Sequence, residues 1–229
     1  MVRNGLRQWR ICEMGLAHSP SIVMNGLVLC LDAGNTKSYP GSGTTWTDLS
    51  GNGNNGTLVN GVSFSSNSGG VLITDGINQY IDIISPNLST TNNTIMCATR
   101  YVDLTTPGRI VSARSNNWLL GHHSGNSSSY YANGWVYQPI NSGIGNIWRI
   151  YTATGDYSTD SWGIYANGQF ITSNSNGING PNGFSLGRYG PGNAAYSKAE
   201  ISFLYCYNRV LTAAEITQNF NALRGRFSI

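Results

Sequence analysis

The sequence predicts an antiparallel all-β domain with one short helix near its C-terminus. From Gly26 onwards, short runs rich in Val, Ile, Tyr and Thr alternate with Gly, Asn, Ser and Pro, a pattern typical of many-stranded antiparallel folds. Asn-Gly dipeptides in two of the breaks favour hairpin turns. A helical period of apolar residues begins only near residue 215.

The expected strands are the β-rich runs between these breaks. A chain of 229 residues fits one large all-β domain, so we assign residues 26–229 to a single domain. Residues 1–25 do not alternate and are expected to form an N-terminal arm. The expected strands cover residues 27–32, 57–64, 71–74, 79–84, 94–102, 109–113, 117–122, 129–138, 147–154, 161–173, 184–188 and 199–208.

Two hairpins nearly repeat one another, YANGW at residues 131–135 and YANGQ at residues 165–169. A two-residue hairpin turn of the favoured type needs positive φ at both central positions, which Asn and Gly tolerate best. We therefore expect such a turn at Asn133-Gly134 and another at Asn167-Gly168. The flanking sequences do not match further, so no internal repeat is inferred.

The one expected helix spans about residues 213–223. Thr212 and Glu215 have the spacing of a capping box, in which each side chain bonds the other residue's backbone N–H. Ile216, Phe220 and Leu223 then form one apolar stripe that would pack against the sheets. Gly225 is expected to stop the helix.

The stretch WTDLSGNGNNGTL, residues 46–58, contains the G-x-G-x-x-G spacing of dinucleotide-binding loops. That fingerprint requires a buried strand before the glycines and a helix after them, and both are missing here. We interpret the stretch as a tight loop between two strands. Asp48 and Ser50 are expected to accept hydrogen bonds from N–H groups of the same loop.

Charged residues make up only 10% of the chain, so its surface must consist largely of Asn, Ser, Thr, Gly and Tyr. The net charge of +3 is scattered and forms no stripe of the kind that binds nucleic acid. No apolar run approaches membrane-spanning length, and no signal peptide is visible, which predicts a protein made in a cytosol.

The four cysteines show no C-x-x-C pairing. Cys30, Cys97 and Cys206 lie in apolar strand-like runs, which favours buried free thiols. A Cys30–Cys206 disulfide is the alternative, because first and last strands often lie side by side in a sandwich. The sequence leaves both readings open.

The order of several segments carries a family resemblance. GLVLCLDAGNTKSYPGSGTTWTDLSGNGNNGTL is followed by TDGINQYIDI, WGIYANGQF, FSLGRYG and ISFLYCYNRVLTAAEITQNFNALRGRF. From about Gly26 to Phe227 the chain resembles the laminin-G-like branch of the concanavalin A-like lectin and glucanase superfamily. The resemblance implies a jelly-roll sandwich of two antiparallel sheets.

The segment DLSGNGNNG and the C-terminal segments YNR-x-LT-x-x-EI and RGRF resemble segments of structural proteins of tailed bacteriophages. This resemblance implies a non-enzymatic virion protein, a capsid decoration or head-fibre subunit, made in the host cytoplasm and placed on the particle. The alternative is a tail-associated module that recognises host surface glycans. Capsid or other virion proteins are the expected partners, and homo-oligomers are common among such subunits.

Glucanases share this superfamily, but their pair of closely spaced carboxylates is not visible here. Retaining glycosidases need two carboxyl groups about 5 Å apart, and the resemblance would place them on one strand as E-x-D-x-x-E or E-x-D-x-E. The three glutamates are Glu13 in the arm, Glu200 without a nearby acid, and Glu215 in the capping box. No G-x-S-x-G is present, and His122 and His123 are expected to be exposed loop residues. We therefore expect no enzymatic activity and no catalytic residues.

Calcium is a further question, because laminin-G-like modules often bind it through Asp, Asn and backbone carbonyl groups. Hard oxygen ligands are plentiful in the chain, but the spaced acidic set of legume lectins is absent. We expect no cofactor. If calcium binds, Asp48 and Asp75 are the candidate ligands.

Glycan binding would use a platform of aromatic and amide groups. The candidates lie in the 117–138 hairpin region, where alternate residues must also fill the core. We expect Trp135 and Tyr137 to share one face of the strand, with Val136 on the other. The candidate glycan-binding residues are Trp118, Tyr130, Tyr131, Trp135 and Tyr137.

The arm combines apolar and basic residues that would suit a docking segment. Apolar side chains there would gain from burial against a partner, and the arginines could pair with its acidic groups. The candidate docking residues are Arg3, Arg7, Trp9, Arg10, Ile11, Met14 and Leu16.

Overall fold

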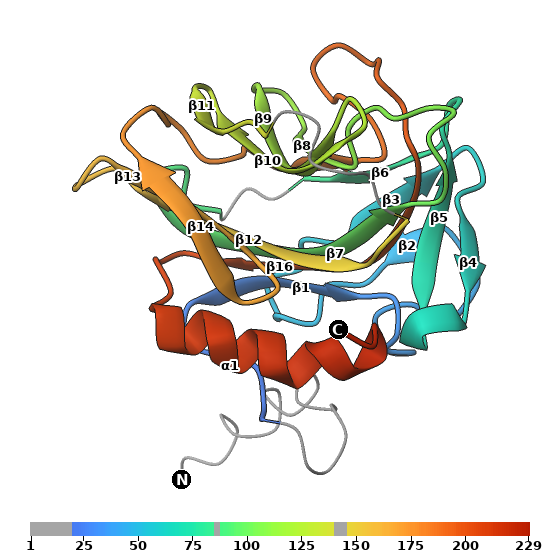
Figure 1. The fold of residues 1–229 in the computed structure, drawn as a ribbon. Helices are drawn as coiled ribbons and strands as arrows, with labels where there is room; N and C mark the ends of the chain where they lie inside the picture. Colours follow the sequence, from blue (N-terminus) through green and yellow to red (C-terminus); the bar gives the residue numbers. More distant parts are fainter. Residues whose placement is uncertain (1–19, 85–87, 140–145) are drawn as a thin grey trace, which may run out of the picture.

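Two antiparallel β-sheets stack face to face, and the α-helix near the C-terminus lies against the outside of one of them (Figure 1). The computed structural model describes residues 20–84, 88–139 and 146–229. The predicted all-β jelly-roll sandwich with one short C-terminal helix is confirmed. The seven candidate docking residues of the arm lie outside the described residues.

Sheet A is the sheet that the helix covers. Its central strand β16 pairs with β7 along one side and with β5 and then β1 along the other. The spatial order is β14 (Gln169–Asn174), β13 (Ser161–Ala166), β12 (Arg149–Asp156), β7 (Asn92–Tyr101), β16 (Lys198–Tyr207), β5 (Val71–Asp75) and β4 (Ser63–Ser65), with β1 (Leu27–Asp32) also on β16.

Sheet B lies opposite, and no helix of the described residues covers its outer face (Figure 1). Its strand order is β11 (Trp135–Tyr137), β10 (Asn126–Ala132), β9 (Trp118–His123), β8 (Val111–Ala113), β15 (Phe184–Leu186), β6 (Tyr80–Ile83), β3 (Gly56–Val59) and β2 (Thr45–Trp46). The expected strands 57–64, 129–138 and 161–173 are each divided in two by a turn, and β2 was not anticipated.

Hydrophobic side chains form two cores, one between the sheets and one between sheet A and the helix. The first core includes Trp46, Trp118 and Trp162, and the second includes Phe203 and Ile216. In the described part of the chain, no helix is both long and apolar enough to cross a membrane.

Cys30 and Cys206 lie on neighbouring strands, yet they do not pair with each other. Leu29, not Cys30, is opposite Cys206, so Cys206 faces the first core while Cys30 faces the second. Cys97 and Cys206 are buried free thiols, as predicted. Cys30 is disulfide-bonded, so the expectation of a free thiol is wrong there.

Helix α1 (Ala213–Leu223) has the bounds that the sequence predicts. Thr212 accepts from the Glu215 backbone N–H while the Glu215 side chain accepts from Thr212 N–H, which confirms the capping box. Glu215 also accepts two hydrogen bonds from Arg209, and these bonds lower the pKa of Glu215 to about 2. A 3₁₀ turn, η3 (Arg224–Arg226), follows directly, so Gly225 does not stop the helix.

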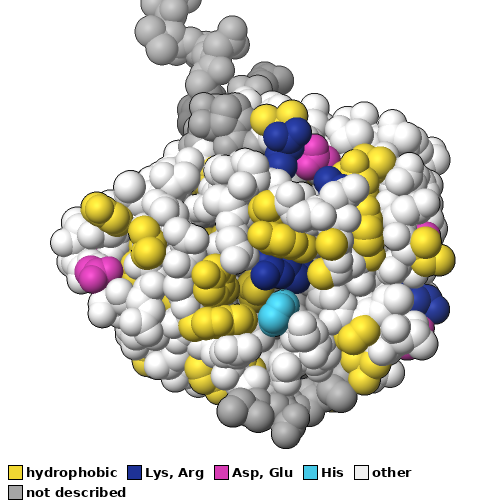
Figure 2. Space-filling model, turned by 90° about the horizontal axis from the view of Figure 1, so that it is seen from above, with side chains coloured by type: hydrophobic (Ala, Val, Ile, Leu, Met, Phe, Trp, Pro, Cys, Tyr) yellow, Lys and Arg dark blue, Asp and Glu magenta, His cyan; other side chains and the backbone are white. Residues whose placement is uncertain are grey.

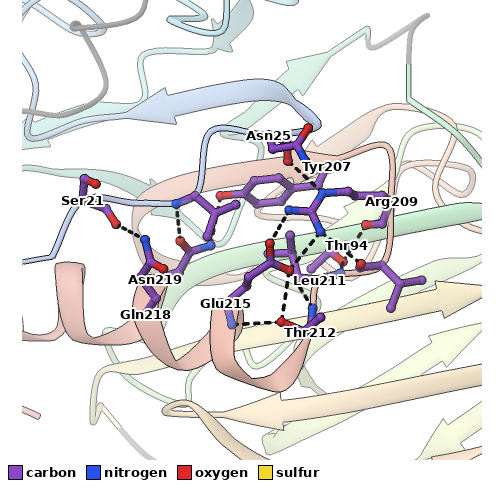
Figure 3. Close-up of polar contacts among 12 residues, drawn as sticks. Ser21, Asn25, Thr94, Tyr207, Arg209, Leu211, Thr212, Glu215, Gln218 and Asn219 are labelled. Carbon is purple, nitrogen blue, oxygen red and sulfur yellow. Dashed lines mark hydrogen bonds and ion pairs between the residues drawn. The ribbon is translucent and has the colours of Figure 1, made fainter.

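Residues 20–25 are tied to α1 by polar contacts (Figure 3). Asn219 is fully buried; its Oδ1 accepts from Val23 N–H at 2.7 Å and its Nδ2 donates to the Tyr207 hydroxyl at 3.0 Å. Gln218 donates to the Ser21 carbonyl at 2.8 Å. Ile22 and Val23 belong to the second core, so this end of the expected arm packs as part of the domain body.

The loop after β2 is organised by Asp48, which is 7% exposed. Its Oδ1 accepts from the N–H groups of Cys30 and Ser50, both at 2.9 Å. Its Oδ2 accepts from the Ser50 hydroxyl at 2.8 Å and from Asn54 N–H at 3.0 Å. The expected role of Asp48 within its own loop is confirmed. The same role is confirmed for Ser50, because its Oγ accepts from the Asn52 N–H at 3.3 Å.

The two Asn-Gly turns differ. Asn167 and Gly168 have φ of 50° and 74°, as the predicted hairpin turn requires. At the other turn Asn133 has φ of 59°, but Gly134 is not in the positive region. Glycine is required there by close approach instead, because a Cβ would lie 1.7 Å from the Asn176 carbonyl oxygen.

Candidate glycan-binding site

The outer face of sheet B carries a cluster of partly exposed aromatic side chains. Tyr131 on β10 lies opposite Trp135 on β11, and their rings meet edge to face with centroids 5.0 Å apart. The His123 ring lies 5.7 Å from that of Trp135. We call Tyr131, Trp135, His123 and the adjoining Arg109 and Tyr189 the platform.

A register shift in the β10–β11 hairpin decides which aromatic residues reach the platform. Tyr131 pairs with Trp135, but the preceding Tyr130 pairs with Tyr137. The extra residue, Val136, breaks the alternation, so Tyr137 packs against the first core beside Tyr130. The expectation that Trp135 and Tyr137 share a face is therefore wrong. The expected position of Val136 on the face opposite Trp135 is confirmed, because Val136 is buried in the first core.

Trp118 and Tyr130 are fully buried and make an edge-to-face pair inside the first core. They support the platform from below and cannot contact a ligand on the surface. Of the five candidate glycan-binding residues, the structure brings Tyr131 and Trp135 together at an accessible face.

Arg109 extends the platform towards β8. Its guanidinium lies over the Tyr189 ring at 4.2 Å and donates from Nη1 to the Asn117 side-chain oxygen at 2.8 Å. The Arg109 backbone N–H bonds the Ala195 carbonyl at 2.9 Å, which joins this segment to the loop of residues 188–196. Arginine stacked on an aromatic face keeps its N–H edge available to a ligand.

The loop of residues 188–196 is held down on sheet B. Ser112 Oγ donates to the Arg188 carbonyl at 2.7 Å and accepts from Gly190 N–H at 3.1 Å. A Cβ on Gly190 would lie 2.3 Å from the Ala113 carbonyl oxygen, so only glycine permits this approach. Arg188 lies over the Tyr80 ring at 3.4 Å, which places a second stacked arginine on the same side of the sandwich.

Burial and the charge of Arg109 together lower the pKa of His123. The imidazole is therefore neutral at pH 7 and offers one donor and one acceptor nitrogen. Figure 2, which looks onto this face, shows a histidine beside basic side chains in a hydrophobic surround. Aromatic faces with neutral donors and acceptors suit the apolar faces and hydroxyl groups of a sugar.

His122, by contrast, is buried between the sheets and is not the exposed loop residue that the sequence suggested. Its Nδ1 lies 3.2 Å from the Thr99 hydroxyl, and its ring packs edge-on against Tyr101 and Tyr151. Burial, with the nearby charge of Arg149, lowers the pKa of His122 to about 3. We assign it to the core.

The two candidate calcium ligands, Asp48 and Asp75, each lie in a hydrogen-bonded turn of the described structure. Both oxygens of Asp48 accept hydrogen bonds from their own loop, as described above. Asp75 Oδ1 accepts from the N–H groups of Ile77, Asn78 and Gln79; burial would raise the pKa of Asp75, but these bonds outweigh it and lower the pKa. Within residues 20–84, 88–139 and 146–229, no three His, Cys, Asp or Glu side chains gather at one point.

The two glutamates in the described residues both form ion pairs. Glu200 lies 2.6 Å from Arg100 on the helix-covered side of the fold, and Glu215 is bound by Arg209 and the capping box. Neither faces the platform.

An open hollow of about 400 Å³ lies elsewhere and is lined by Tyr157, Asp160, Ser175, Gly177 and Ile178. It contains one exposed aromatic ring, Tyr157, and no cation. It therefore offers a sugar fewer aromatic faces than the platform and no guanidinium group.

Sequence reasoning missed Arg109, His123 and Tyr189 as platform residues. They come from three separate segments, of which the one with Tyr189 lies more than 60 residues after the other two, and no local spacing links them. The fold alone brings them together, so only a prediction of strand order could have found this set.

No protein-family model matches the sequence, and no curated protein matches it. Solved structures share the fold. Trypanosoma rangeli sialidase is similar with a TM-score of 0.70 and 15% identity, over 97% of this chain and 38% of that one. The chain therefore spans about two fifths of the sialidase.

Two smaller domains are also similar. Domain 4 of AbnA, a GH43 extracellular arabinanase from Geobacillus stearothermophilus, was solved with arabinotriose; its TM-score is 0.62 with 19% identity, over 85% of this chain and 98% of that one. The binding domain of Paraclostridial Mosquitocidal Protein 1 has a TM-score of 0.60 and 21% identity, over 86% and 52% of the two chains. At these identities the likeness shows the fold alone, a concanavalin A-like β-sandwich.

Proposed function

We propose that this chain is a non-enzymatic carbohydrate-binding module that holds a glycan on the outer face of sheet B. The observation that carries the proposal is the edge-to-face pair of Tyr131 and Trp135, joined by His123, on the sheet that no helix covers. The arabinotriose complex of AbnA domain 4, a sandwich of similar size, supports this substrate class.

The absence of enzymatic activity is part of the proposal. It is supported by Glu200 and Glu215, the two glutamates in the described residues, because each is bound to an arginine away from the platform. A bound polysaccharide should therefore release no reducing sugar over prolonged incubation.

Replacing Trp135 with alanine should weaken binding to a bound polysaccharide by about tenfold or more, because central aromatic contacts contribute at least about 1.4 kcal/mol in many interfaces. The melting temperature should change little, since the Trp135 ring is partly exposed. Affinity electrophoresis in gels containing bacterial surface polysaccharides measures both the binding and its loss.

Tyr157→Ala is the matched control. Tyr157 is an exposed aromatic residue, 61% accessible, and it lines the separate hollow. We expect this variant to bind like the unmodified protein. Equal binding by the unmodified protein and the Trp135→Ala variant would contradict the platform.

We further infer that the module is displayed on the virion of a tailed bacteriophage, as a capsid decoration or head-fibre subunit or, alternatively, as a tail-associated receptor module. The resemblance of the DLSGNGNNG and RGRF segments supports this setting, and so does a surface with only 10% charged residues. The laminin-G-like assignment within the sandwich class rests on the order of the segments between Gly26 and Phe227. The part of the arm before residue 20, which contains the seven candidate docking residues, is then the proposed docking segment.

Quantitative mass spectrometry of purified particles tests the virion setting. A ratio to the major capsid protein near one, or near a simple fraction set by capsid symmetry, supports decoration. A handful of copies supports the tail module. Particles without this chain would overturn the virion assignment, while the glycan-binding proposal would still stand.

A further inference from the structure

The arginines on the outer face of sheet B differ in their partners. Arg114 is paired with Asp82 at 3.0 Å. Arg109 and Arg188 take part in none of the ion pairs found among residues 20–84, 88–139 and 146–229. Asp82 is also the only acidic residue in the strands of sheet B and in the loop of residues 188–196.

Neutral groups hold both unpaired guanidinium groups in place. Arg109 stacks on Tyr189 and donates to Asn117, as described above. Arg188 lies over Tyr80, donates from Nε to the Ser185 hydroxyl at 2.8 Å, and also bonds Asn193. These contacts fix the planes of the two side chains without neutralising their charge.

A fixed, partly buried cation without a counter-ion has lost hydration that neutral protein groups replace only in part. Burial lowers the pKa of Arg109, consistent with this cost. In the described structure only one of its five side-chain N–H groups is used, the one bound to Asn117. The remaining N–H groups have the planar fork geometry that matches a carboxylate.

We propose that the platform selects acidic glycans, with Arg109 binding the carboxylate of a uronic-acid type sugar whose ring packs on Tyr131 and Trp135, and with Arg188 binding a second carboxylate further along the chain. This inference rests on the proposed glycan-binding function and adds its ligand class. Neutral His123 beside Arg109 supplies one hydrogen-bond donor and one acceptor to hydroxyl groups of the sugar.

The test uses pairs of polysaccharides that differ only in charge. Hyaluronate, alginate and polygalacturonate are each compared with their carboxyl-reduced forms, in which the uronic acids are converted to neutral hexoses without a change in linkage. We expect the full chain to bind at least one acidic form about 10- to 100-fold more tightly than its reduced partner at 0.15 M salt, the range for a charge-assisted hydrogen bond.

Arg109→Gln should remove most of this difference, measured as the ratio of the affinities for the acidic and the reduced form. Arg188→Gln is the second variant, which keeps the test valid if Arg109→Gln fails to fold. The matched control is Arg224→Gln. Arg224 is exposed and follows α1 on the opposite side of the fold, and its replacement changes the net charge by the same amount. The control should retain the full preference.

The outcomes separate the two proposals. Equal binding of the acidic and reduced forms would overturn the acidic preference and leave glycan binding intact. An equal loss of preference in Arg109→Gln and Arg224→Gln would also overturn it, because it would indicate a general effect of net charge. If neither form of any polysaccharide binds, and binding to neutral glycans is also absent, the proposed function itself fails.

Discussion

Replacing Asp48 with alanine should lower the free energy of unfolding by about 3–4 kcal/mol, the sum expected when a buried side-chain acceptor is removed and its four donors lose their partner. Four donors would be affected: three backbone N–H groups and the Ser50 hydroxyl. The Cys30 N–H lies in the buried strand β1, where water cannot readily replace the carboxylate. Urea unfolding followed by tryptophan fluorescence measures the loss.

Asp156→Ala is the matched control for this prediction. Asp156 also accepts several hydrogen bonds within its own turn, from Ser158 and Thr159, but that turn is open to solvent. Water can satisfy those donors, so we expect a loss of no more than about 1 kcal/mol. Similar losses for the two variants would show that burial is not what makes Asp48 important.

Replacing Asn219 with alanine should cost about 3 kcal/mol, because it leaves the buried Val23 N–H and the Tyr207 hydroxyl without their partner and opens a cavity under α1. Gln218→Ala removes one solvent-exposed bond to Ser21 from the same helix and should cost less than about 1 kcal/mol. Chemical unfolding of the two variants measures the difference.

Hydrogen exchange locates the effect of the Asn219 change. We expect faster exchange of the amides at residues 22 and 23 in Asn219→Ala, with the strands of sheet B unchanged. If exchange there is unaltered, Asn219 stabilises the helix alone and does not hold residues 20–25 against it.

The elements that the sequence predicted well are those set by local chemistry. Thr212 and Glu215 bond each other across one turn, and the stripe beginning at Ile216 needs only a helical period, so the helix bounds agreed with the structure. Asp48 satisfies donors of its own loop, which its sequence context already suggested. Strand positions followed from composition in the same way.

What could not be predicted depends on contacts between distant segments. The shift that separates Tyr137 from Trp135 is a single extra residue in a hairpin, and alternation gives no sign of it. Glycine is required at position 134 by the close approach of the Asn176 carbonyl some forty residues later, and Cys30 faces away from Cys206 by one position of register. The stacking of Arg109 on Tyr189 joins segments eighty residues apart.

The strand order of sheet B gives its outer face a regular spacing between side chains of neighbouring strands. From Trp135 on β11 to Tyr80 on β6 there are five strand spacings, or roughly 24 Å at about 4.8 Å each. One spacing is close to the length of one pyranose unit in an extended chain. A polysaccharide running across the strands would therefore meet a new strand at about every sugar, so affinity should rise with oligosaccharide length until the chain spans both arginines and then level off.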